Sequence, residues 1–268
     1  MKKWIYVLAI YLCGLVIAAP IQDRRIDPTA LSELTSALGI PQDANIVDET
    51  QKRWLRRPDQ ERWELAELSA DQRQIVLHWA TEQGFFSAWR PFYNTYDKAL
   101  ILGATTSRMQ MRLDYLKKLW EEGVRFREVV WLTGDRPLDN RVDGLLDRCS
   151  NESQAARILW EEADLPDEML HLSVVFIAVP MKMQGGLLKR PDTKDTIVAW
   201  LAMAPEPCRA VFISDQPFCG YQFAVINACL PDAFQFDLVG SGVKASSHPS
   251  AAAITLDSIA RWIYTESL

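Results

Sequence analysis

The sequence predicts an α/β protein with a three-layer αβα, Rossmann-like architecture: a mostly parallel five-stranded doubly wound sheet, with an N-terminal helical extension. Three observations predict this fold. Short apolar stretches in the later part of the chain lack the polar alternation of a half-exposed strand, which indicates strands buried on both faces. Helical stretches separate them, as the crossovers of a parallel sheet require. The early part of the chain has helical periodicity and no such strand.

Residues 1–19 resemble an export signal, either a signal peptide or an uncleaved anchor. Lys2 and Lys3 precede an apolar run over 4–19 that carries no charge, and small or apolar residues at 16–18 offer a cleavage site. The run is slightly shorter than the ~20 residues of a membrane span, which favours a signal peptide. Both interpretations place the folded part outside the cytosol, in the periplasm or secreted, with a membrane contact only through this segment if it is uncleaved.

Residues 20–95 are expected to form the helical extension. The stretch "DPTALSELTSAL" has Asp27 or Thr29 as its N-cap and a periodic apolar face. The stretch "LSADQRQIVLHWATEQGFF" begins with a capping box formed by Ser69 and Gln72. The extension is also rich in tryptophan, which either packs in a core or forms a surface for a partner.

Residues 96–268 are expected to form the Rossmann-like domain. The predicted strands lie at 99–102, 129–132, 174–179, 210–213 and 234–239. The predicted helices lie at 107–122, 152–162, 193–203, 221–230 and 251–264. Right-handed crossovers then leave few topologies, of which a doubly wound sheet is the simplest.

Charge and cysteine usage narrow the class of protein. The formal net charge is −6 over 268 residues, which argues against a nucleic-acid partner. Four cysteines follow the apolar segment: Cys149, Cys208, Cys219 and Cys229. Four cysteines in an exported protein allow three disulfide pairings, and the alternative is that most of them are small buried thiols. None of them has the C-x-x-C spacing of a zinc or redox site.

The stretch "ALILGATTSRMQMRLDYLKKLW" contains the first loop expected to bind a ligand, because ligands of open α/β sheets bind outside the carboxyl ends of the strands. Gly103 ends a strand, and Thr105 or Thr106 caps a helix whose first N–H groups favour an anion. Arg108 and Arg112 share one side of that helix. The dinucleotide fingerprint and the P-loop are both absent, so no cofactor is assigned.

Three further strand ends contribute candidate residues. The loop "LTGDR" supplies Thr133, Gly134 and Arg136; the start of the next helix supplies Thr193; and "SDQPFCGYQ" supplies Ser214, Gln216, Tyr221 and Gln222. The carboxylates expected as acid/base or hydroxyl-binding candidates are Asp135, Asp195 and Asp215. The spacing of Asp135, Asp139 and Asp143 matches no familiar calcium or magnesium loop, so no metal site is predicted.

Residues 98–240 resemble the YdcF/SanA/ElyC-like family of bacterial envelope proteins, a domain of unknown function. The resemblance rests on "ALILGA", on Arg112 in the next helix, on "LTGDR", and on Glu152 at the start of "ESQAARILWEE". Thr193 with Asp195, and Ser214 at a strand end, complete it. The family implies a Rossmann-like sheet, an envelope location and a nucleotide-like or cell-wall-linked ligand.

Two functions are therefore expected, from different classes. The first is an exported protein that binds a small anionic or nucleotide-like molecule at the carboxyl ends of the strands, with or without a reaction in cell-envelope metabolism. The second is a non-catalytic interaction protein that uses the tryptophans of the extension: Trp54, Trp63, Trp79 and Trp89. A serine hydrolase is disfavoured, because G-x-S-x-G is absent and no histidine sits at a predicted strand end.

Overall fold

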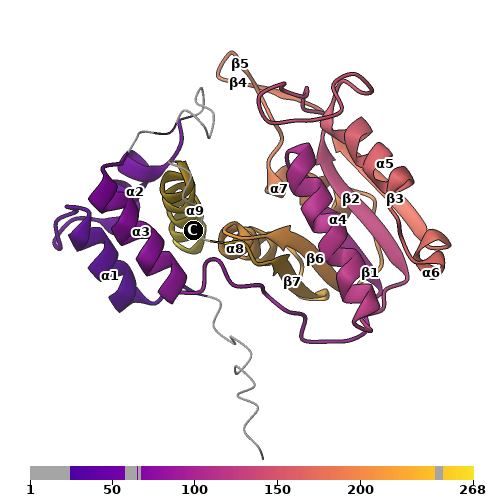
Figure 1. The fold of residues 1–268 in the computed structure, drawn as a ribbon, viewed down its shortest axis with the longest axis horizontal. Helices are drawn as coiled ribbons and strands as arrows, with labels where there is room; N and C mark the ends of the chain where they lie inside the picture. Colours follow the sequence, from indigo (N-terminus) through magenta and orange to yellow (C-terminus); the bar gives the residue numbers. More distant parts are fainter. Residues whose placement is uncertain (1–24, 58–64, 66–67, 245–249) are drawn as a thin grey trace, which may run out of the picture.

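The computed structural model describes residues 25–57, 65, 68–244 and 250–268 (Figure 1). The predicted export segment, residues 1–19, and Trp63 lie outside the described residues. Within the described part of the chain, no helix is both long and apolar enough to cross a membrane.

The core of the protein is a five-stranded, all-parallel sheet, which confirms the predicted fold class. Its strands in chain order are β1 (Lys98–Leu102), β2 (Glu128–Gly134), β3 (Ser173–Val179), β6 (Arg209–Asp215) and β7 (Gln235–Ser241). Their spatial order is β3-β2-β1-β6-β7. The chain therefore builds the sheet in one direction from β1 to β3 and then crosses back to add β6 beside β1. The switch in strand order lies between β1 and β6, where doubly wound sheets bind ligands.

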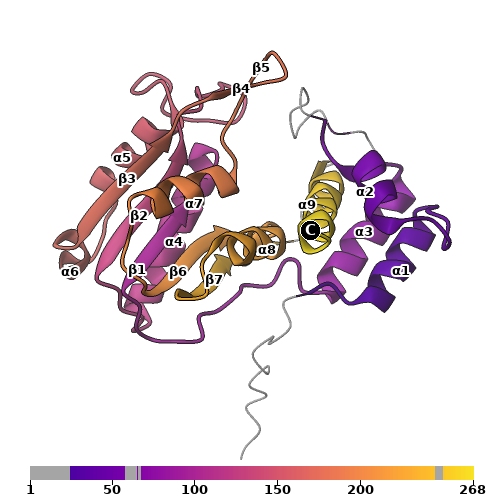
Figure 2. The same cartoon turned by 180° about the vertical axis from the view of Figure 1, so that it is seen from behind.

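Alternate side chains of each strand enter two separate cores, as they must in a sheet covered on both faces. Ile101 and Trp131 pack under α4 (Thr106–Glu121) and α5 (Glu152–Glu162). Leu100, Val130 and Phe212 pack on the opposite face under α7 (Thr193–Ala202) and α8 (Cys219–Cys229). The views from the front and from behind show these helix pairs on the two faces of the sheet (Figures 1 and 2).

Every predicted strand and helix of this region begins and ends within two residues of its position in the structure. The sequence did not predict α6 (Asp167–Leu170) or the antiparallel hairpin β4 (Lys182–Gln184) and β5 (Leu187–Lys189). These elements have three or four residues each, too few to show a period.

A helical lobe packs beside the sheet. It contains α1 (Pro28–Ala37), α2 (Ile46–Trp54), α3 (Ala70–Glu82) and the C-terminal helix α9 (Ser250–Glu266). The predicted caps are present: the Asp27 carboxylate accepts from the Ala30 N–H at 2.8 Å, and Ser69 and Gln72 form the capping box. Figure 1 shows α9, in yellow, between α8 and the helices of the extension.

The C-terminal helix α9 shares its core with the extension, although the sequence placed it with residues 96–268. Leu256, Ile259 and Trp262 of α9 belong to one buried cluster with side chains from α1, α2 and α3. Gly220 of α8 admits this arrangement, because a Cβ at that position would overlap the Trp262 ring. The first and last segments of the chain therefore form one hydrophobic unit that is attached to the sheet through α8.

The described tryptophans of the extension are core residues. Trp54 and Trp79 keep only 7% and 6% of their surface exposed. The Trp89 ring makes edge contacts with Phe223 and Trp262, at centroid separations of 6.4 Å in both cases. Trp54 and Trp79 pack inside the lobe, and Trp89 packs against α8 and α9, so these indoles stabilise the fold through buried apolar area and aromatic geometry.

The four cysteines of the described chain are free thiols rather than disulfide partners. Cys219 is fully buried at the start of α8, whereas the other three are partly buried. Burial raises the pKa of Cys149, Cys208 and Cys229, because an apolar environment disfavours the thiolate.

Tyr115 of α4 connects the sheet domain to the extension and makes stability depend on alkaline pH. Its hydroxyl donates to the Trp89 carbonyl at 2.9 Å, and burial, outweighing the lowering effect of Arg90, raises its pKa from 10 to about 12. Between these pH values the Tyr115 hydroxyl loses its proton in the unfolded chain but keeps it in the folded protein. We expect the free energy of unfolding to fall as pH rises from 10 to 12, as measured by urea denaturation.

Tyr115→Phe is the matched control for this pH dependence, because it keeps the ring and removes the ionisable hydroxyl. The fall between pH 10 and 12 should be smaller in the variant than in the parent. Equal slopes in the two proteins would contradict the assignment to Tyr115.

Candidate functional site

The carboxyl ends of β1 and β6 meet at a buried ion pair between Arg112 and Asp215. Arg112 Nε donates to Asp215 Oδ1 at 2.7 Å, and Arg112 Nη2 lies 2.7 Å from the same oxygen. Arg112 Nη1 donates to the carbonyls of Leu102 at 2.6 Å and Gly103 at 2.9 Å. The guanidinium thus joins a helix to the ends of two neighbouring strands, and all three of its nitrogens contact protein groups.

Arg108, one helical turn earlier, binds the other oxygen of the same carboxylate. Its Nη1 donates to Asp215 Oδ2, and its guanidinium carbon lies 4.4 Å from the centre of the Phe218 ring. The Arg108 side chain keeps 26% of its surface exposed, against 2% for Arg112 and none for Asp215. Arg108 is therefore the member of this trio that solvent or a ligand can reach.

A second buried charge cluster lies beside the first, below the loop after β2. Arg136 Nε donates to Glu152 Oε2 at 3.0 Å, and Arg136 Nη1 donates to Asp143 Oδ2 at 2.6 Å. Glu152 Oε1 also accepts the Gly134 N–H at 3.1 Å. The cluster attaches the long loop between β2 and α5 to the end of the sheet.

Opposing effects set the ionisation of the two acids in this cluster. Burial raises the pKa of Glu152, and the nearby Arg136 and Arg112 charges only partly offset that rise. Burial also acts to raise the pKa of Asp143, but hydrogen bonds from Arg136 and from the N–H groups of Asp139 and Thr106 outweigh it and lower the pKa. The influence of Arg112 on Glu152 shows that the two charge clusters lie close enough to interact.

Gly103 separates the two clusters, and only glycine fits there. A Cβ on Gly103 would overlap Glu152 Oε1 and lie 2.7 Å from the Leu132 carbonyl oxygen. Gly103 also donates its N–H to that Leu132 carbonyl at 2.7 Å. The glycine expected at a ligand loop therefore allows a carboxylate to approach the strand end closely.

The two threonines after Gly103 play different parts. Thr106 is buried: its N–H donates to Asp143 Oδ1 at 2.9 Å, and its hydroxyl accepts the Gly144 N–H at 2.8 Å. Thr105 is the N-cap residue of α4 and makes no side-chain capping bond to the helix. Asp143 thus caps the first N–H group of α4, which belongs to Thr106. The next two N–H groups of the helix are those of Ser107 and Arg108.

The predicted residues at the end of β2 and at the start of α7 mostly serve the fold. Thr133 is buried and donates its hydroxyl to the Ile177 carbonyl at 2.7 Å, within the sheet. A Cβ on Gly134 would lie 2.6 Å from Pro191 Cγ. Thr193 is the first residue of α7, and it is half-buried.

The loop after β6 is buried throughout. The hydroxyl of Ser214 donates to the Gln222 side-chain oxygen, and Gln216 Nε2 donates to the Ser87 carbonyl of the extension at 2.9 Å. Tyr221 is half-buried, with its ring edge-on to Phe218. Gln216 therefore links the candidate site to the chain segment that leads in from the helical lobe.

The three candidate acid/base carboxylates lie in different surroundings. Asp215 is fully buried between two arginines. Asp195 completes the capping box of α7 with Asp192 and forms an ion pair with Lys182 at 2.6 Å. Asp135 is exposed, and its backbone N–H donates to the Val179 carbonyl. The structure brings four predicted site residues, Gly103, Arg108, Arg112 and Asp215, into one contact group. It joins a further pair, Ser214 and Gln222.

Glu152 and Asp143 were not among the predicted ligand-binding or acid/base residues, yet they organise the site. In the sequence, Glu152 is an acid at a helix start, which is the ordinary preference of the helix dipole. Asp143 is one of several acids in a turn-rich loop. A single sequence has no signal that separates a buried acid from an exposed one at such positions.

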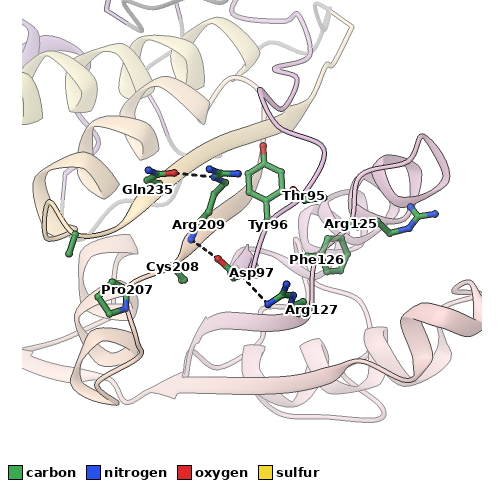
Figure 3. Close-up of a pocket in the computed structure, with 11 residues that line it drawn as sticks. Thr95, Tyr96, Asp97, Arg125, Phe126, Arg127, Pro207, Cys208, Arg209 and Gln235 are labelled. Atoms are coloured by element: carbon green, nitrogen blue, oxygen red, sulfur yellow. Dashed lines mark hydrogen bonds and ion pairs between the residues drawn. The ribbon is translucent and has the colours of Figure 1, made fainter.

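Two cavities among the described residues lie away from this edge of the sheet. One, of about 510 Å³, opens at the amino ends of the strands (Figure 3). The other, of about 370 Å³, lies between α4 and α5. Neither is lined by a predicted site residue.

Comparisons of the chain with protein-family models, with curated proteins and with solved structures find no match.

Proposed function

We propose that the protein binds a small anionic or nucleotide-like molecule at the carboxyl ends of β1 and β6, with Arg108 as its contact cation. The observation that supports this proposal is the position of the Arg108 guanidinium at the switch in strand order, partly exposed and held on two sides. Asp215 holds it by an ion pair and Phe218 by stacking. A cation that is already oriented loses less rotamer freedom when it binds an anion.

The start of α4 adds to the attraction for an anion. Arg108 lies in the first turn of α4, where backbone N–H groups have no partner within the helix and the helix dipole favours negative charge. Thr105 forms no side-chain cap there. A phosphate or carboxylate beside Arg108 would therefore meet the guanidinium and the helix start together.

Arg112 acts as a positioning residue in this proposal rather than as a ligand contact. Its nitrogens bind Asp215 and two strand-end carbonyls, and its side chain is 2% exposed. Arg112 thereby fixes the carboxylate that orients Arg108.

We further propose that the chain is a divergent member of the YdcF/SanA/ElyC-like family and is exported to the envelope. The positions that carry the resemblance support the first part: Arg112 and Glu152 lie on the two sides of Gly103. Residues 1–19 support the second part.

Partner binding through the tryptophans of the extension receives no comparable support. Trp54 and Trp79 are buried and Trp89 packs between other rings, so the described indoles have other roles.

Binding of inorganic phosphate and of AMP to the full chain and to Arg108→Gln, measured by calorimetry, tests the proposed function. We expect the substitution to weaken binding at least tenfold, because it removes a charge-assisted hydrogen bond. Arg148→Gln removes an arginine that pairs with Glu162 on the surface, and should leave the affinity unchanged.

The fold of Arg108→Gln should survive, because Arg112 still pairs with Asp215. Urea denaturation checks this point. Undiminished phosphate and AMP binding in a folded Arg108→Gln variant would refute the proposed function.

A further inference from the structure

The cavity at the amino ends of the strands lies at the edge of the sheet opposite the proposed site. Its volume of about 510 Å³ falls in the range of small-molecule sites. Its walls come from the segments that lead into β1, β2, β6 and β7. Figure 3 shows the side chains that decide its chemistry: Asp97, Arg127, Arg209 and Gln235.

Arg127 supplies an exposed positive charge to this cavity. Its side chain keeps 86% of its surface exposed, and its ion-pair partner, Asp97 Oδ1, lies 3.7 Å from Nη1. That separation is too long for a hydrogen bond. The guanidinium is therefore available for a closer oxyanion.

Arg209 supplies a second, better oriented cation. Its Nε donates to Gln235 Oε1 at 3.1 Å, and its guanidinium carbon lies 4.2 Å from the centre of the Tyr93 ring. Its two terminal nitrogens donate to no group among the described residues. A planar guanidinium held at Nε and on one face presents these terminal donors in the fork that matches a carboxylate.

Arg125 also lines the cavity, but its charge is used elsewhere. Its Nη1 donates to the carbonyls of Trp120 and Val124, and its guanidinium stacks on the Trp120 ring at 4.5 Å. Figure 3 shows its guanidinium directed away from the other polar groups of the cavity.

Asp97 lies between the two available arginines. Its Oδ2 accepts the backbone N–H of Arg209 at 2.9 Å, and its Oδ1 faces Arg127. Figure 3 draws the two guanidinium groups on either side of this carboxylate. A ligand that brings only acid groups would meet repulsion from Asp97, whereas a ligand that also brings a hydrogen-bond donor would satisfy it.

We propose that this cavity is a second binding site, separate from the site at Arg108, for a small dicarboxylate with a hydroxyl or ammonium group between its acids. One acid group pairs with Arg127 and the other with Arg209. The hydroxyl or ammonium group donates to Asp97.

Calorimetric titration of the full chain with malate and with succinate, at constant ionic strength, tests this site. The two probes differ by one hydroxyl group. We expect malate to bind about tenfold more tightly than succinate, because one hydrogen bond to a charged acceptor is worth about that factor. Equal affinities for the two probes would overturn the proposal. So would the absence of malate binding at a concentration of about 10 mM.

Single variants assign the binding to this cavity. Arg127→Gln and Arg209→Gln should each weaken malate binding about tenfold, by loss of one acid–guanidinium pair. The Arg127 side chain is so exposed that the Arg127→Gln substitution should not unfold the protein. Arg127→Gln is therefore the decisive variant if Arg209→Gln is unstable. Unchanged malate affinity in Arg127→Gln would also overturn the proposal.

Asp97→Asn tests the role of the carboxylate, because the amide oxygen can still accept the Arg209 N–H. We expect succinate to bind more tightly to this variant than to the parent, and the preference for malate to fall to less than about threefold. An unchanged preference would refute the assigned contact.

Arg108→Gln separates this proposal from the proposed function. It should leave malate binding intact while it weakens phosphate and AMP binding at the carboxyl edge. Arg127→Gln should show the reverse pattern. Loss of malate binding in Arg108→Gln would place the dicarboxylate at the carboxyl edge and overturn the second site.

Discussion

Replacing Arg112 with alanine is expected to lower the free energy of unfolding by about 3 kcal/mol or more. Removing one partner of a buried ion pair leaves the other charge uncompensated, at a typical cost of about 3–5 kcal/mol. Asp215 would keep Arg108 as a partner, which places the expected loss near the lower end of that range. The carbonyls of Leu102 and Gly103 would also lose their donor. Urea denaturation monitored by tryptophan fluorescence measures the loss.

Lys118→Ala is the matched control on the same helix. Lys118 is 56% exposed and lies 3.9 Å from Glu122, so its loss should change stability by no more than about 0.5 kcal/mol. Arg112→Ala with wild-type stability would show that the ion pair does not hold the strand ends together, and would remove the positioning role assigned to Arg112.

Replacing Glu152 with alanine is expected to destabilise the fold by a similar amount, about 3–5 kcal/mol. The Glu152 carboxylate accepts from Arg136 and from the Gly134 N–H, and both donors are buried. Without the carboxylate, these buried donors lose their acceptor and a cavity is left behind, and both changes lower the free energy of unfolding. Arg136 would still pair with Asp143, so the β2–α5 loop should loosen rather than detach.

Two variants on the same helix separate this effect from general damage. Glu152→Gln keeps an oxygen for the Gly134 N–H and most of the volume, so it should lose less stability than Glu152→Ala. Glu161→Ala, at an exposed position of α5, should stay within about 0.5 kcal/mol of the parent. Equal stability of the Glu152→Ala and Glu161→Ala variants in urea would contradict the importance of this contact.

The strands of the sheet could be predicted because a strand buried on both faces consists almost entirely of apolar residues. Strands such as 129–132 and 210–213 are apolar throughout, and they match β2 and β6. Helix caps are similarly local, and Asp27 and Ser69 act as expected. Short elements such as β4 and β5 carry no such mark, because three residues show no period.

The candidate site could be predicted only in part. The rule for strand ends selected both the helix after Gly103 and the end of the strand at Ser214, and in the structure Arg112 and Asp215 from these two segments are in contact. The rule could not decide whether an arginine there binds a ligand or the protein itself. That outcome depends on the position of one carboxylate to within an ångström, which no spacing in the sequence encodes.

The helical lobe shows the same limit. Gly220 lies inside α8 and makes room for the Trp262 ring of α9, a contact that no local pattern in the sequence indicates. The sequence also left open whether Trp54 and Trp79 face solvent or a core, because a tryptophan can occupy either place.

The sequence by itself determined the order, the type and, to within two residues, the bounds of the five strands of the sheet and of α4, α5, α7, α8 and α9, because each depends on neighbours a few residues away. Only the tertiary structure decided that Asp215 and Glu152 pair with Arg112 and Arg136, and that the two ends of the chain share one core. The contact between Arg136 and Glu152 joins residues 16 positions apart. The hydrogen bond from the Arg56 N–H to the Asp257 carboxylate joins residues 201 positions apart. They depend on how the layers pack, and packing is a property of the whole fold rather than of any local pattern.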